Sequence, residues 1–495
     1  MTLQTMTREP RIDIQTSIAA LVVGLAREGT ALTRVLAGRG ARVTVTDIRP
    51  AGELSESVAL LDDLPVTLAL GGHPLSLLNE SEIVFVSPGV PPDIPLLVEA
   101  RRRGLPFSSE TRLFTRLCPA QVVGITGSSG KTTTTALTGE MLKATGRKTW
   151  VGGNIGRPLI GHLDEIGPED AVVMELSSFQ LEMFAPGKND ERSYALYDPA
   201  GWSPPIAAML NITPNHLDRH PSMDAYIAAK AQILNYQQAC DIAVLNMDNA
   251  ITRQMGESDQ VRARRVWFSL EQEVEEGAFL RGEELILRCA GDEQAVGVAS
   301  EIQLMGRHNM ANCLAATALA AAAGASVEAM HQTATTFQGV EHRLELVRER
   351  NGVRWYNDSI ATTPERTVAA LRAFEAPIVL LAGGRDKHLP WNEMAALTWR
   401  KAQHLILFGE AVGLVCDAMQ TNDSDITIDP SAAPYLQHKT HIHGAGTLER
   451  AVAIAAQVAE PGDVVLLSPG GTSFDAYPDF AARGEHFRQL VETLE

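Results

Sequence analysis

The sequence predicts an α/β protein built from three consecutive domains. The chain has 495 residues, which is more than one hydrophobic core usually serves. Apolar strand patterns that end in glycine or proline turns alternate with helical patterns. These alternations fall into three groups, at about residues 1–118, 119–338 and 339–495. We expect the first and the third domain to be Rossmann-like, because open α/β sheets arise from such alternation.

The composition indicates a protein that works in the cytoplasm. The net charge is −18, from 42 basic and 60 acidic residues, which argues against a general binder of nucleic acid or of anionic membranes. The five cysteines are scattered without a CxxC pair, as is typical of reduced thiols. The N-terminal segment is polar and shows no signal peptide, and no apolar stretch is long enough to span a bilayer. We therefore expect a cytoplasmic monomer with small-molecule partners.

The first domain opens with a strand, a glycine turn, a helix and a second strand over residues 18–50, and Asp47 ends the second strand. The dinucleotide pattern GxGxxG is not met, because Ala26 stands where the middle glycine belongs. A Rossmann-like domain without NAD is the prediction. Residues 83–92 form a further strand that ends in a Pro-Gly turn, and strand ends are where ligands bind in such sheets.

The second domain begins with the stretch GITGSSGKTTTT, residues 124–135. A glycine-rich turn between a strand and a helix points N–H groups at an anion. Lys131 can reach the β- and γ-phosphates, and the hydroxyl of Thr132 or Thr133 can take Mg²⁺. The strict phosphate-loop pattern is missed at Ile125, so a Ser/Gly turn that binds nothing is the alternative. The strand before and the helix after the loop favour a central ATPase-like domain.

Four features near this loop each have a structural alternative. Glu175 ends an apolar strand and is placed to be a magnesium ligand, but it could also be a helix cap or a surface acid. The loop with His216, Asp218 and His220 could hold a metal or could be solvated. Lys230 stands alone in a nearly uncharged helix, where a lysine usually reaches for solvent. Residues 186–205 are polar and turn-prone and predict a surface insertion of no assigned role.

The third domain contains the strand patterns GVRWYNDSI, APIVLLAGG and DVVLLSPGG, each ending in a polar or glycine turn. Helical patterns separate them. Such strand ends are expected to gather at one edge of a sheet and to form a ligand site there.

Taken together, the motifs resemble the Mur ligases, the ATP-dependent amide-forming enzymes of peptidoglycan precursor synthesis. The matching stretches run in the order of the family and cover nearly the whole chain: TGSSGKTTTT, GGNIGRPL, ELSSFQLE, LNITPNHLDRH, AAK, GRHNMANCLAA, GVEHRLE, NDSIATTPE, GGRDK and SPGGTSFDAYPDFAARG. The combination of ELSSFQLE, NHLDRH and SFDAYPDF resembles the glutamate-adding branch.

This resemblance implies roles for individual residues. The catalytic set would be Lys131, Glu175, His216 and Lys230. One Mg²⁺ would lie on Thr132 and Glu175, and a second on His216 and Lys230, the latter carbamylated. The residues implied for ATP are Gly127, Ser128, Ser129, Gly130, Lys131, Thr132, Thr133, Asn312, Arg343 and Asp358. Those implied for the UDP substrate are Asp47, Ser87, Pro88, Gly89 and Asn154, and those for glutamate are Thr362, Lys387, Ser473 and Phe480.

The implied reaction has two steps. ATP phosphorylates the alanyl carboxylate of UDP-N-acetylmuramoyl-L-alanine, and the amine of glutamate attacks the acyl phosphate to give an amide, ADP and phosphate. D-glutamate is favoured. Ile360 departs from the family, which has lysine there, and Arg385 or Arg366 could compensate. Asn215 also departs, so an L-glutamate-adding member of the family is kept as an alternative.

Other classes explain less of the sequence. A different Mur-type or folylpolyglutamate-type ligase does not account for ELSSFQLE and SFDAYPDF. A phosphate-loop switch or motor leaves the strand ends of the third domain without a purpose. A non-catalytic nucleotide-binding scaffold would tolerate loss of Lys131, Glu175, His216 or Lys230, and all four are intact.

Overall fold

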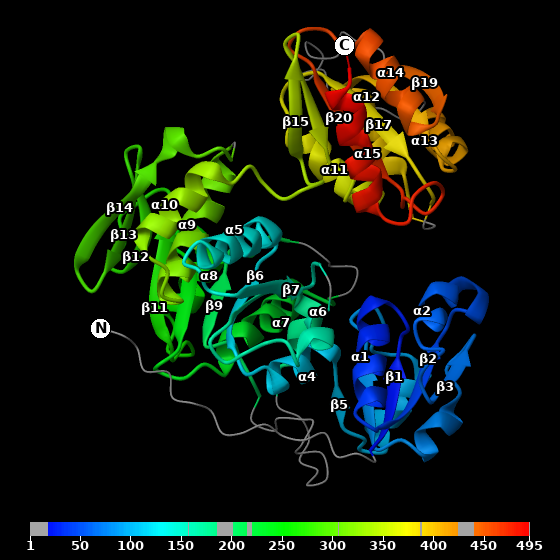
Figure 1. Cartoon of the computed structure of the whole chain (residues 1–495), viewed down its shortest axis with the longest axis vertical. Helices are drawn as coiled ribbons and strands as arrows, with labels where there is room; N and C mark the ends of the chain where they lie inside the picture. The colour runs from blue at the N-terminus through cyan, green and yellow to red at the C-terminus, as the bar shows by residue number, and fades with distance from the viewer. Residues whose placement is uncertain are drawn as a thin grey trace. The chain divides into compact units, whose positions relative to one another are not determined.

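The computed structural model describes residues 18–156, 158–185, 201–214, 220–304, 306–386, 389–423 and 440–494. The chain divides into two compact units, Met1–Phe337 and Gln338–Glu495. The first unit contains a five-stranded and a nine-stranded sheet, and the second unit contains a six-stranded sheet (Figure 1). This confirms the predicted α/β class with three sheets in series. The predicted domain boundary at residues 118 and 119 lies inside the first unit and stays a prediction.

The N-terminal sheet is parallel throughout and has the strand order β3-β2-β1-β4-β5. The order reverses between β1 and β4, and open α/β sheets bind ligands beside such a reversal. Its strands are β1 (Ala19–Val23), β2 (Arg42–Asp47), β3 (Val66–Leu70), β4 (Ile83–Val86) and β5 (Phe107–Ser108). Its helices are α1 (Arg27–Gly38), α2 (Ser55–Ala59), α3 (Pro95–Arg102) and α4 (Glu110–Leu117), with short 3₁₀ turns η1 (Ala51–Leu54) and η2 (Leu75–Asn79).

The central sheet has the order β14-β13-β12-β11-β10-β9-β6-β8-β7. Its strands are β6 (Gln121–Thr126), β7 (Thr149–Gly153), β8 (Ala171–Glu175), β9 (Ile206–Met209), β10 (Ile242–Asn246), β11 (Arg264–Ser269), β12 (Gly277–Arg281), β13 (Glu284–Cys289) and β14 (Asp292–Val298). The pairs β12–β13 and β13–β14 are antiparallel, and the other pairs are parallel. Strand β6 therefore lies between β8 and β9, and all three point the same way.

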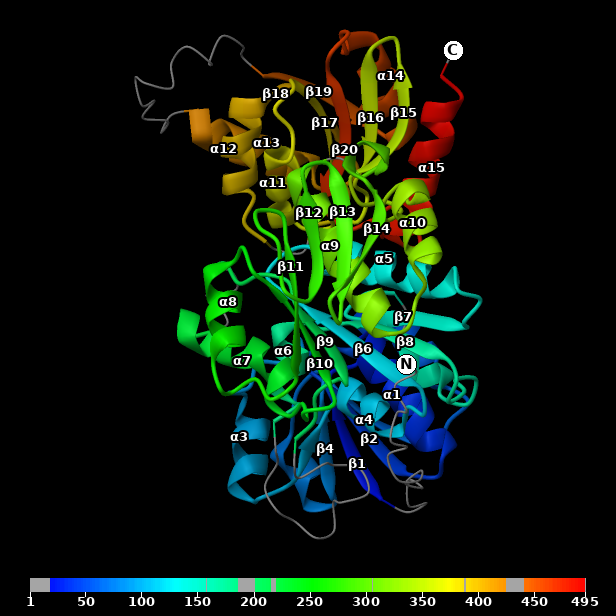
Figure 2. The same ribbon diagram turned by 90° about the vertical axis from the view of Figure 1, so that its left-hand side faces the viewer.

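The helices of the central part are α5 (Lys131–Lys143), α6 (Ser178–Glu182), α7 (Met223–Asn235), α8 (Ala250–Glu257), α9 (Arg307–Ala322) and α10 (Val327–Thr336), with 3₁₀ turns η3 (Leu159–His162) and η5 (Ala299–Glu301). Helices α5 and α9 pack together over one core, α9 contacts β11 and β12, and α10 contacts β14 (Figure 2). Alanines of α9 are buried there, because small side chains let two helices and a sheet approach closely. Within the described helices, none combines the length and the apolar character needed to cross a membrane.

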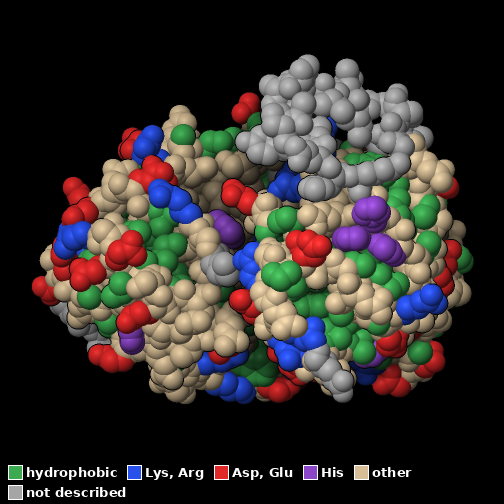
Figure 3. Space-filling model, turned by 90° about the horizontal axis from the view of Figure 1, so that it is seen from above, with side chains coloured by type: hydrophobic (Ala, Val, Ile, Leu, Met, Phe, Trp, Pro, Cys, Tyr) green, Lys and Arg blue, Asp and Glu red, His purple; other side chains and the backbone are tan. Residues whose placement is uncertain are grey.

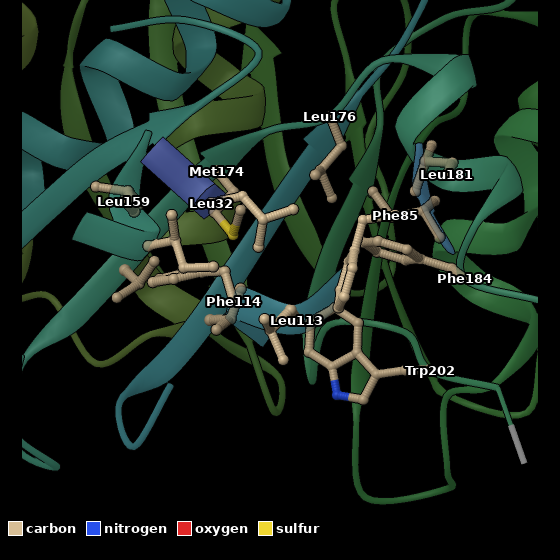
Figure 4. Close-up of a cluster of buried hydrophobic side chains, with 14 of the residues drawn as sticks. Leu32, Phe85, Leu113, Phe114, Leu159, Met174, Leu176, Leu181, Phe184 and Trp202 are labelled. Carbon is tan, nitrogen blue, oxygen red and sulfur yellow. The ribbon is translucent and has the colours of Figure 1, made fainter. Parts of the chain in front are cut away.

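The other face of the central sheet shares a core with the N-terminal sheet. Phe85 of β4, Phe114 of α4 and Met174 of β8 belong to one buried cluster, drawn in Figure 4. Aromatic side chains of this size each bury a large apolar area, so the cluster stabilises the first unit as a whole. The two sheets of this unit are thus held together by apolar packing.

The expectation of a surface insertion at residues 186–205 is wrong for its last part. Residues 186–200 lie outside the described part of the chain, but the described residues 201–204 are buried. Trp202 belongs to the shared core and meets the ring of Phe184 edge to face, with 5.3 Å between the ring centroids. The sequence pattern misled because four glycine, serine and proline residues surround this one apolar anchor.

The second unit has the strand order β15-β16-β20-β17-β18-β19. Its strands are β15 (Glu345–Arg350), β16 (Val353–Asn357), β17 (Ile378–Gly383), β18 (Ala402–Phe408), β19 (His441–Gly446) and β20 (Val464–Gly470). Among the described strands of this unit, only β15 runs antiparallel to its neighbour. Its helices are α11 (Pro364–Arg372), α12 (Asn392–Lys401), α13 (Val412–Asp423), α14 (Leu448–Val458) and α15 (Phe480–Glu492), and apolar clusters cover both faces of the sheet. The three predicted strands are confirmed as β16, β17 and β20.

Charged side chains of both signs are interspersed on the face drawn in Figure 3. On the face drawn in Figure 3, the coloured side chains show acidic and basic groups side by side and no broad basic area. This face therefore lacks the electrostatic footprint of a nucleic-acid binder among the residues that the structure describes.

The substitution Trp202→Ala should lower the free energy of unfolding of the first unit by about 3–5 kcal/mol, because it opens a cavity in the shared core. Denaturant unfolding followed by near-ultraviolet circular dichroism measures this. Leu60→Ala is the control, since Leu60 is 57% exposed in the same unit and should change little. Equal stability of Trp202→Ala and the unaltered chain would show that Trp202 is no part of the core.

Candidate active site

The predicted phosphate loop lies at the carboxyl end of β6. Residues Gly127–Gly130 leave the strand, and α5 begins at Lys131. Gly130 has φ of 80°, and a Cβ built there would lie 2.3 Å from Oδ1 of Asn312. Glycine is therefore required at this position both by the backbone conformation and by the close approach of α9. The predicted ATP residues Gly130 and Asn312 are thereby brought together.

The loop is held in shape by Asn211, which follows β9. The carbonyl and the side-chain Oδ1 of Asn211 accept hydrogen bonds of 2.9 Å from the backbone N–H groups of Ser128 and Ser129. The ammonium of Lys131 donates to the carbonyls of Gly127, at 3.0 Å, and Ser128, at 3.3 Å. The lysine thus lies over the loop, where its charge adds to the positive end of the α5 dipole.

Glu175 is the centre of a second cluster. Its side chain is buried at the end of β8. One carboxylate oxygen accepts from the hydroxyl of Thr132 at 2.7 Å, and the other accepts from the amide of Asn154 at 2.8 Å. All three residues were proposed from separate motifs, with Thr132 lying 43 and Asn154 lying 21 residues before Glu175. The structure brings them together.

The donor set of this cluster fits magnesium. Hydroxyl and carboxylate oxygens are ligands that Mg²⁺ prefers, and it completes its shell with water and phosphate oxygens. Among the described residues, no three His, Cys, Asp or Glu side chains are arranged to hold a metal ion. A magnesium ion here would accordingly rely on Thr132, Glu175 and oxygens of a bound nucleotide.

Lys230 points inward. Its side chain is buried, and its ammonium donates to the carbonyl of Gly127 at 2.9 Å and to the hydroxyl of Thr126 at 3.3 Å. Burial, and then the nearby charge of Lys131, lower the pKa of Lys230 to about 7, although Glu175 raises it. The alternative of a lysine that reaches for solvent is therefore wrong. A substantial fraction of this amine is neutral near pH 7, and a neutral amine is the form that reacts with electrophiles.

Some predicted residues cannot be placed. His216, Asp218 and Asn215 lie outside the described residues, as does Lys387. His220 is described and is buried, so the alternative of a solvated histidine is wrong for it. Its ring nitrogens face Ser178 and Glu182, which lie on α6.

The residues proposed for the UDP part lie at the strand reversal of the N-terminal sheet. Asp47 is buried, and its carboxylate accepts from the backbone N–H of Leu25 at 2.8 Å and from the guanidinium and backbone N–H of Arg49. Burial raises the pKa of Asp47, but these hydrogen bonds outweigh it and hold the pKa at about 2. Ser87 donates to the carbonyl of Gly24 at 3.0 Å, so both loops of the reversal are fixed.

A small cavity opens beside these loops. Its lining includes Ser87 and Pro88 of the N-terminal sheet and Phe179 and Glu182 of α6. Gly89, which was proposed together with Ser87 and Pro88, does not line it. The N-terminal sheet and the central part thus share a cavity within the first unit.

In the second unit, Asp358 follows β16 and is buried. It accepts from the backbone N–H of Leu344 at 3.2 Å and from the hydroxyl of Ser468 at 2.9 Å. Burial raises the pKa of Asp358 to about 7, against the lowering by Ser468 and by Arg343. The predicted partners Arg343 and Asp358 are therefore close enough to interact electrostatically.

Sequence reasoning missed Arg483, which organises the strand ends of the second unit. Its guanidinium is fully buried and donates to the hydroxyl of Ser359 at 3.0 Å, the carbonyl of Ser359 at 2.9 Å and the carbonyl of Gly471 at 3.2 Å. The hydroxyl of Ser359 donates in turn to the carbonyl of Phe480 at 2.7 Å. Arg483 thus joins the three segments that carry Thr362, Ser473 and Phe480. An arginine in an amphipathic helix gave no local signal of this.

The two arginines proposed to compensate for Ile360 have different hydrogen-bonding partners. Arg366 donates to the carbonyl of Ile360 at 2.9 Å and lowers the pKa of Asp358. Arg385 instead pairs with Glu410 through two hydrogen bonds of 2.9 and 3.0 Å. Arg366 is therefore the cation beside position 360.

The substitution Asp358→Asn should flatten the pH dependence of the stability of the second unit. The pKa of Asp358 in the folded chain, about 7, lies above its ordinary value of 3.8. Its contribution to stability is therefore complete below pH 4 and is lost as the pH rises through 7, by up to about 4 kcal/mol. Hydrogen exchange of β16 and β20 in the whole chain, from pH 4 to 8, measures the difference between the two proteins. A difference that does not change with pH would contradict the raised pKa.

Comparisons with known proteins agree with this geometry. Three family models match the chain in order: the Mur ligase MurD-like N-terminal domain over residues 19–109, the Mur ligase middle domain over 125–320, and the Mur ligase glutamate ligase domain over 342–471. The solved structure of the UDP-N-acetylmuramate–alanine ligase of Thermotoga maritima covers 96% of this chain and 99% of its own, with a TM-score of 0.54 and 17% identity. At that identity the likeness concerns the fold alone.

Curated relatives are much more similar in sequence. The UDP-N-acetylmuramoylalanine–D-glutamate ligase of Symbiobacterium thermophilum is 43% identical over 477 residues, which cover 96% of this chain and 98% of the relative. The enzyme of the same name from Clostridium novyi is 40% identical over 96% of both chains. Because these matches extend over all three sheets and both units, the chain belongs to the Mur ligase family.

Proposed function

We propose that this chain is the ATP-dependent ligase that joins D-glutamate to UDP-N-acetylmuramoyl-L-alanine in peptidoglycan precursor synthesis. Full-length relatives at 43% and 40% identity carry that activity in their names. The observation that carries the proposal is the cluster of Thr132, Asn154 and Glu175 beside the phosphate loop. Membership of the family also removes the phosphate-loop switch and the non-catalytic scaffold as alternatives.

The phosphate loop would bind the triphosphate of ATP. The backbone N–H groups at the N-terminus of α5 and the ammonium of Lys131 present positive charge to the same region. The ammonium of Lys131 would exchange its hydrogen bonds to the carbonyls of Gly127 and Ser128 for hydrogen bonds to the β- and γ-phosphates. This exchange is favourable because a charge-assisted hydrogen bond to phosphate is stronger than one to a neutral carbonyl. Ser129, Thr133 and Asn312 complete the proposed nucleotide contacts from the loop, α5 and α9.

Two residues would hold one magnesium ion, namely Thr132 through its hydroxyl and Glu175 through its carboxylate. Bound Mg²⁺ neutralises the charge that develops on the phosphoryl group during transfer to the alanyl carboxylate. Asn154 orients Glu175 by its hydrogen bond and would face the muramoyl substrate. His216 and Lys230 are proposed for a second ion, with Lys230 as a carbamate.

The lowered pKa of Lys230 supports the proposed carbamylation. The lone pair of the neutral amine attacks CO₂, and one proton leaves the nitrogen. The product is a carboxylate-like group in place of a cation. Burial and the proximity of Lys131 favour the neutral amine, and a metal ion would compensate the new negative charge.

The second unit would supply the incoming amino acid. Thr362, Ser473, Phe480 and Lys387 are proposed to bind glutamate, and Arg343 and Asp358 to bind ATP. Arg483 holds the segments that carry the first three residues, so it would orient them without touching the substrate. Arg366 would provide the positive charge that Ile360 lacks. The monomeric state and the cytoplasmic location stay predictions.

The purified chain should release phosphate and form the amide when ATP, Mg²⁺, UDP-N-acetylmuramoyl-L-alanine and D-glutamate are present. Glu175→Gln should reduce the rate by about 100-fold or more, because it weakens the charge stabilisation at the metal. Phosphate release and product mass measure both. Turnover with L-glutamate alone would assign the chain to the L-adding alternative, and no turnover with either isomer would refute the proposed ligase.

A carbamate on Lys230 should form as the pH rises through about 7 at a fixed concentration of dissolved CO₂, because only the neutral amine reacts. Carbon-13 magnetic resonance of the chain in labelled bicarbonate detects it. The signal should be absent in Lys230→Arg and present in Lys148→Arg, which alters a lysine with 57% of its side chain exposed. A signal of equal strength in Lys230→Arg would place the carbamate elsewhere.

A further inference from the structure

His220 is a buried histidine that the proposed mechanism does not use. It lies just before α7, and only 3% of the residue is exposed. Its Nε2 lies 3.0 Å from the hydroxyl oxygen of Ser178, and its Nδ1 lies 3.5 Å from Oε1 of Glu182. Both ring nitrogens are therefore directed at α6.

Aromatic rings from two helices contact the ring of His220. The ring stacks on Phe179 of α6, with 5.3 Å between centroids and 3° between the planes. It also lies against Tyr226 of α7, with 5.2 Å between centroids. His220 is thus in contact with both helices, through hydrogen-bonding groups on one and rings on both.

Tyr226 connects this histidine to the phosphate loop. The phenol is buried, and its hydroxyl lies 3.0 Å from the hydroxyl of Ser128. The ammonium of Lys230 lies 4.9 Å from the centre of the Tyr226 ring, a cation–π distance. A displacement of Tyr226 would therefore change the contacts of both Ser128 and Lys230.

Helix α6 connects the same histidine to the substrate cavity. Phe179 and Glu182, two of the contacts of His220, line the cavity beside Ser87 and Pro88. The intervening Gln180 donates to Oε1 of Glu28 at 3.0 Å and to the hydroxyl of Thr111 at 3.1 Å. These hydrogen bonds fix α6 against α1 and α4 of the N-terminal part. A ligand in the cavity would press on residues that touch His220.

We propose that His220 is a positioning residue that couples occupancy of the cavity beside Ser87 and Pro88 to the phosphate loop. The inference rests on the proposed function, in which the chain binds a nucleotide sugar and ATP: Ser87 and Pro88, two residues implied for the UDP substrate, line this cavity, and the phosphate loop would hold ATP. Histidine suits the role because one ring directs two polar atoms at α6 and also contacts the ring of Tyr226. The coupling is reciprocal: each ligand changes the affinity of the chain for the other by the same factor.

Calorimetry with a non-hydrolysable ATP analogue and Mg²⁺ tests the proposal, with and without saturating UDP-N-acetylmuramoyl-L-alanine. The unaltered chain should bind the analogue at least about 5-fold more tightly when the UDP substrate is present. His220→Phe keeps an aromatic ring but loses the hydrogen bond to Ser178 and the polar contact with Glu182, and it should bring this ratio close to one. His220→Gln keeps a hydrogen-bonding group and should retain part of the ratio. The control is His162→Gln. His162 ends η3 and pairs with Glu165, so this substitution should leave the ratio unchanged.

The coupling ratio separates positioning from a general structural role, because a merely destabilised variant keeps its ratio. A ratio in His220→Phe equal to that of the unaltered chain overturns the proposal, and so does a ratio of one in the unaltered chain. Calorimetry does not need turnover, so a chain without ligase activity can still show the coupling. The proposed coupling and the proposed ligase activity can therefore be refuted independently of each other.

A double-mutant cycle provides a second test that needs no UDP substrate. His220→Phe and Tyr226→Phe are combined, and affinity for the Mg²⁺-bound ATP analogue alone is measured. If His220 acts through Tyr226, the effect of the pair should be at least about 2-fold smaller than the product of the single effects. Independent effects that multiply would refute the route through Tyr226, even where the cavity fails to bind the UDP substrate.

Discussion

The geometry of the candidate site in the first unit depends on one buried side chain. The carboxyl group of Glu175 lies buried at the end of β8, and a buried polar group is tolerated only with hydrogen-bonding partners. Those partners are Thr132 at the start of the helix after β6 and Asn154 just after β7. They meet because β6, β8 and β7 are neighbours that run parallel, so that their carboxyl ends share an edge. The strand order is thus what assembles the chemistry of this site.

Much of the fold could be predicted, since its main strands are fully buried and end in glycine or polar turns. The buried strands β6, β8, β17 and β20 are apolar runs of this kind, and each was located from the sequence. Among the strands that the sequence did not locate are β12, β13, β14 and β19, and also the buried β10 and β18. Most residues of β14 and β19 are exposed and form no continuous apolar run, so a local pattern does not separate these two strands from loops. The apolar runs of β10 and β18 are short, and a short apolar run does not by itself distinguish a strand from a buried helix segment.

The candidate site divides in the same physical way. The residues of the phosphate loop and Glu175 were proposed from the sequence because each belongs to a local pattern at the end of an apolar strand. Arg483 and Tyr226 were not assigned a role and His220 was considered only as a possible metal ligand, because the contacts of these side chains are with residues distant in sequence. Ser359 and Arg483 are 124 residues apart, and Ser128 and Tyr226 are 98 apart. Even Lys230 was assigned through a resemblance, since no local pattern tells an inward lysine from an outward one.

The division of the chain after Phe337 has a consequence for how such an enzyme can change its product. The residues proposed to activate the acyl group reside mainly in the first unit, and those proposed to receive the amino acid reside in the second. The buried core and hydrogen bonds that order each set are internal to its own unit. Acceptor choice can therefore drift by substitutions in the second unit while the activating machinery stays intact. A lineage, or an engineer who exchanges residues of the second unit between relatives and keeps Arg343 and Asp358, can alter which amine is joined without rebuilding the phosphoryl-transfer centre.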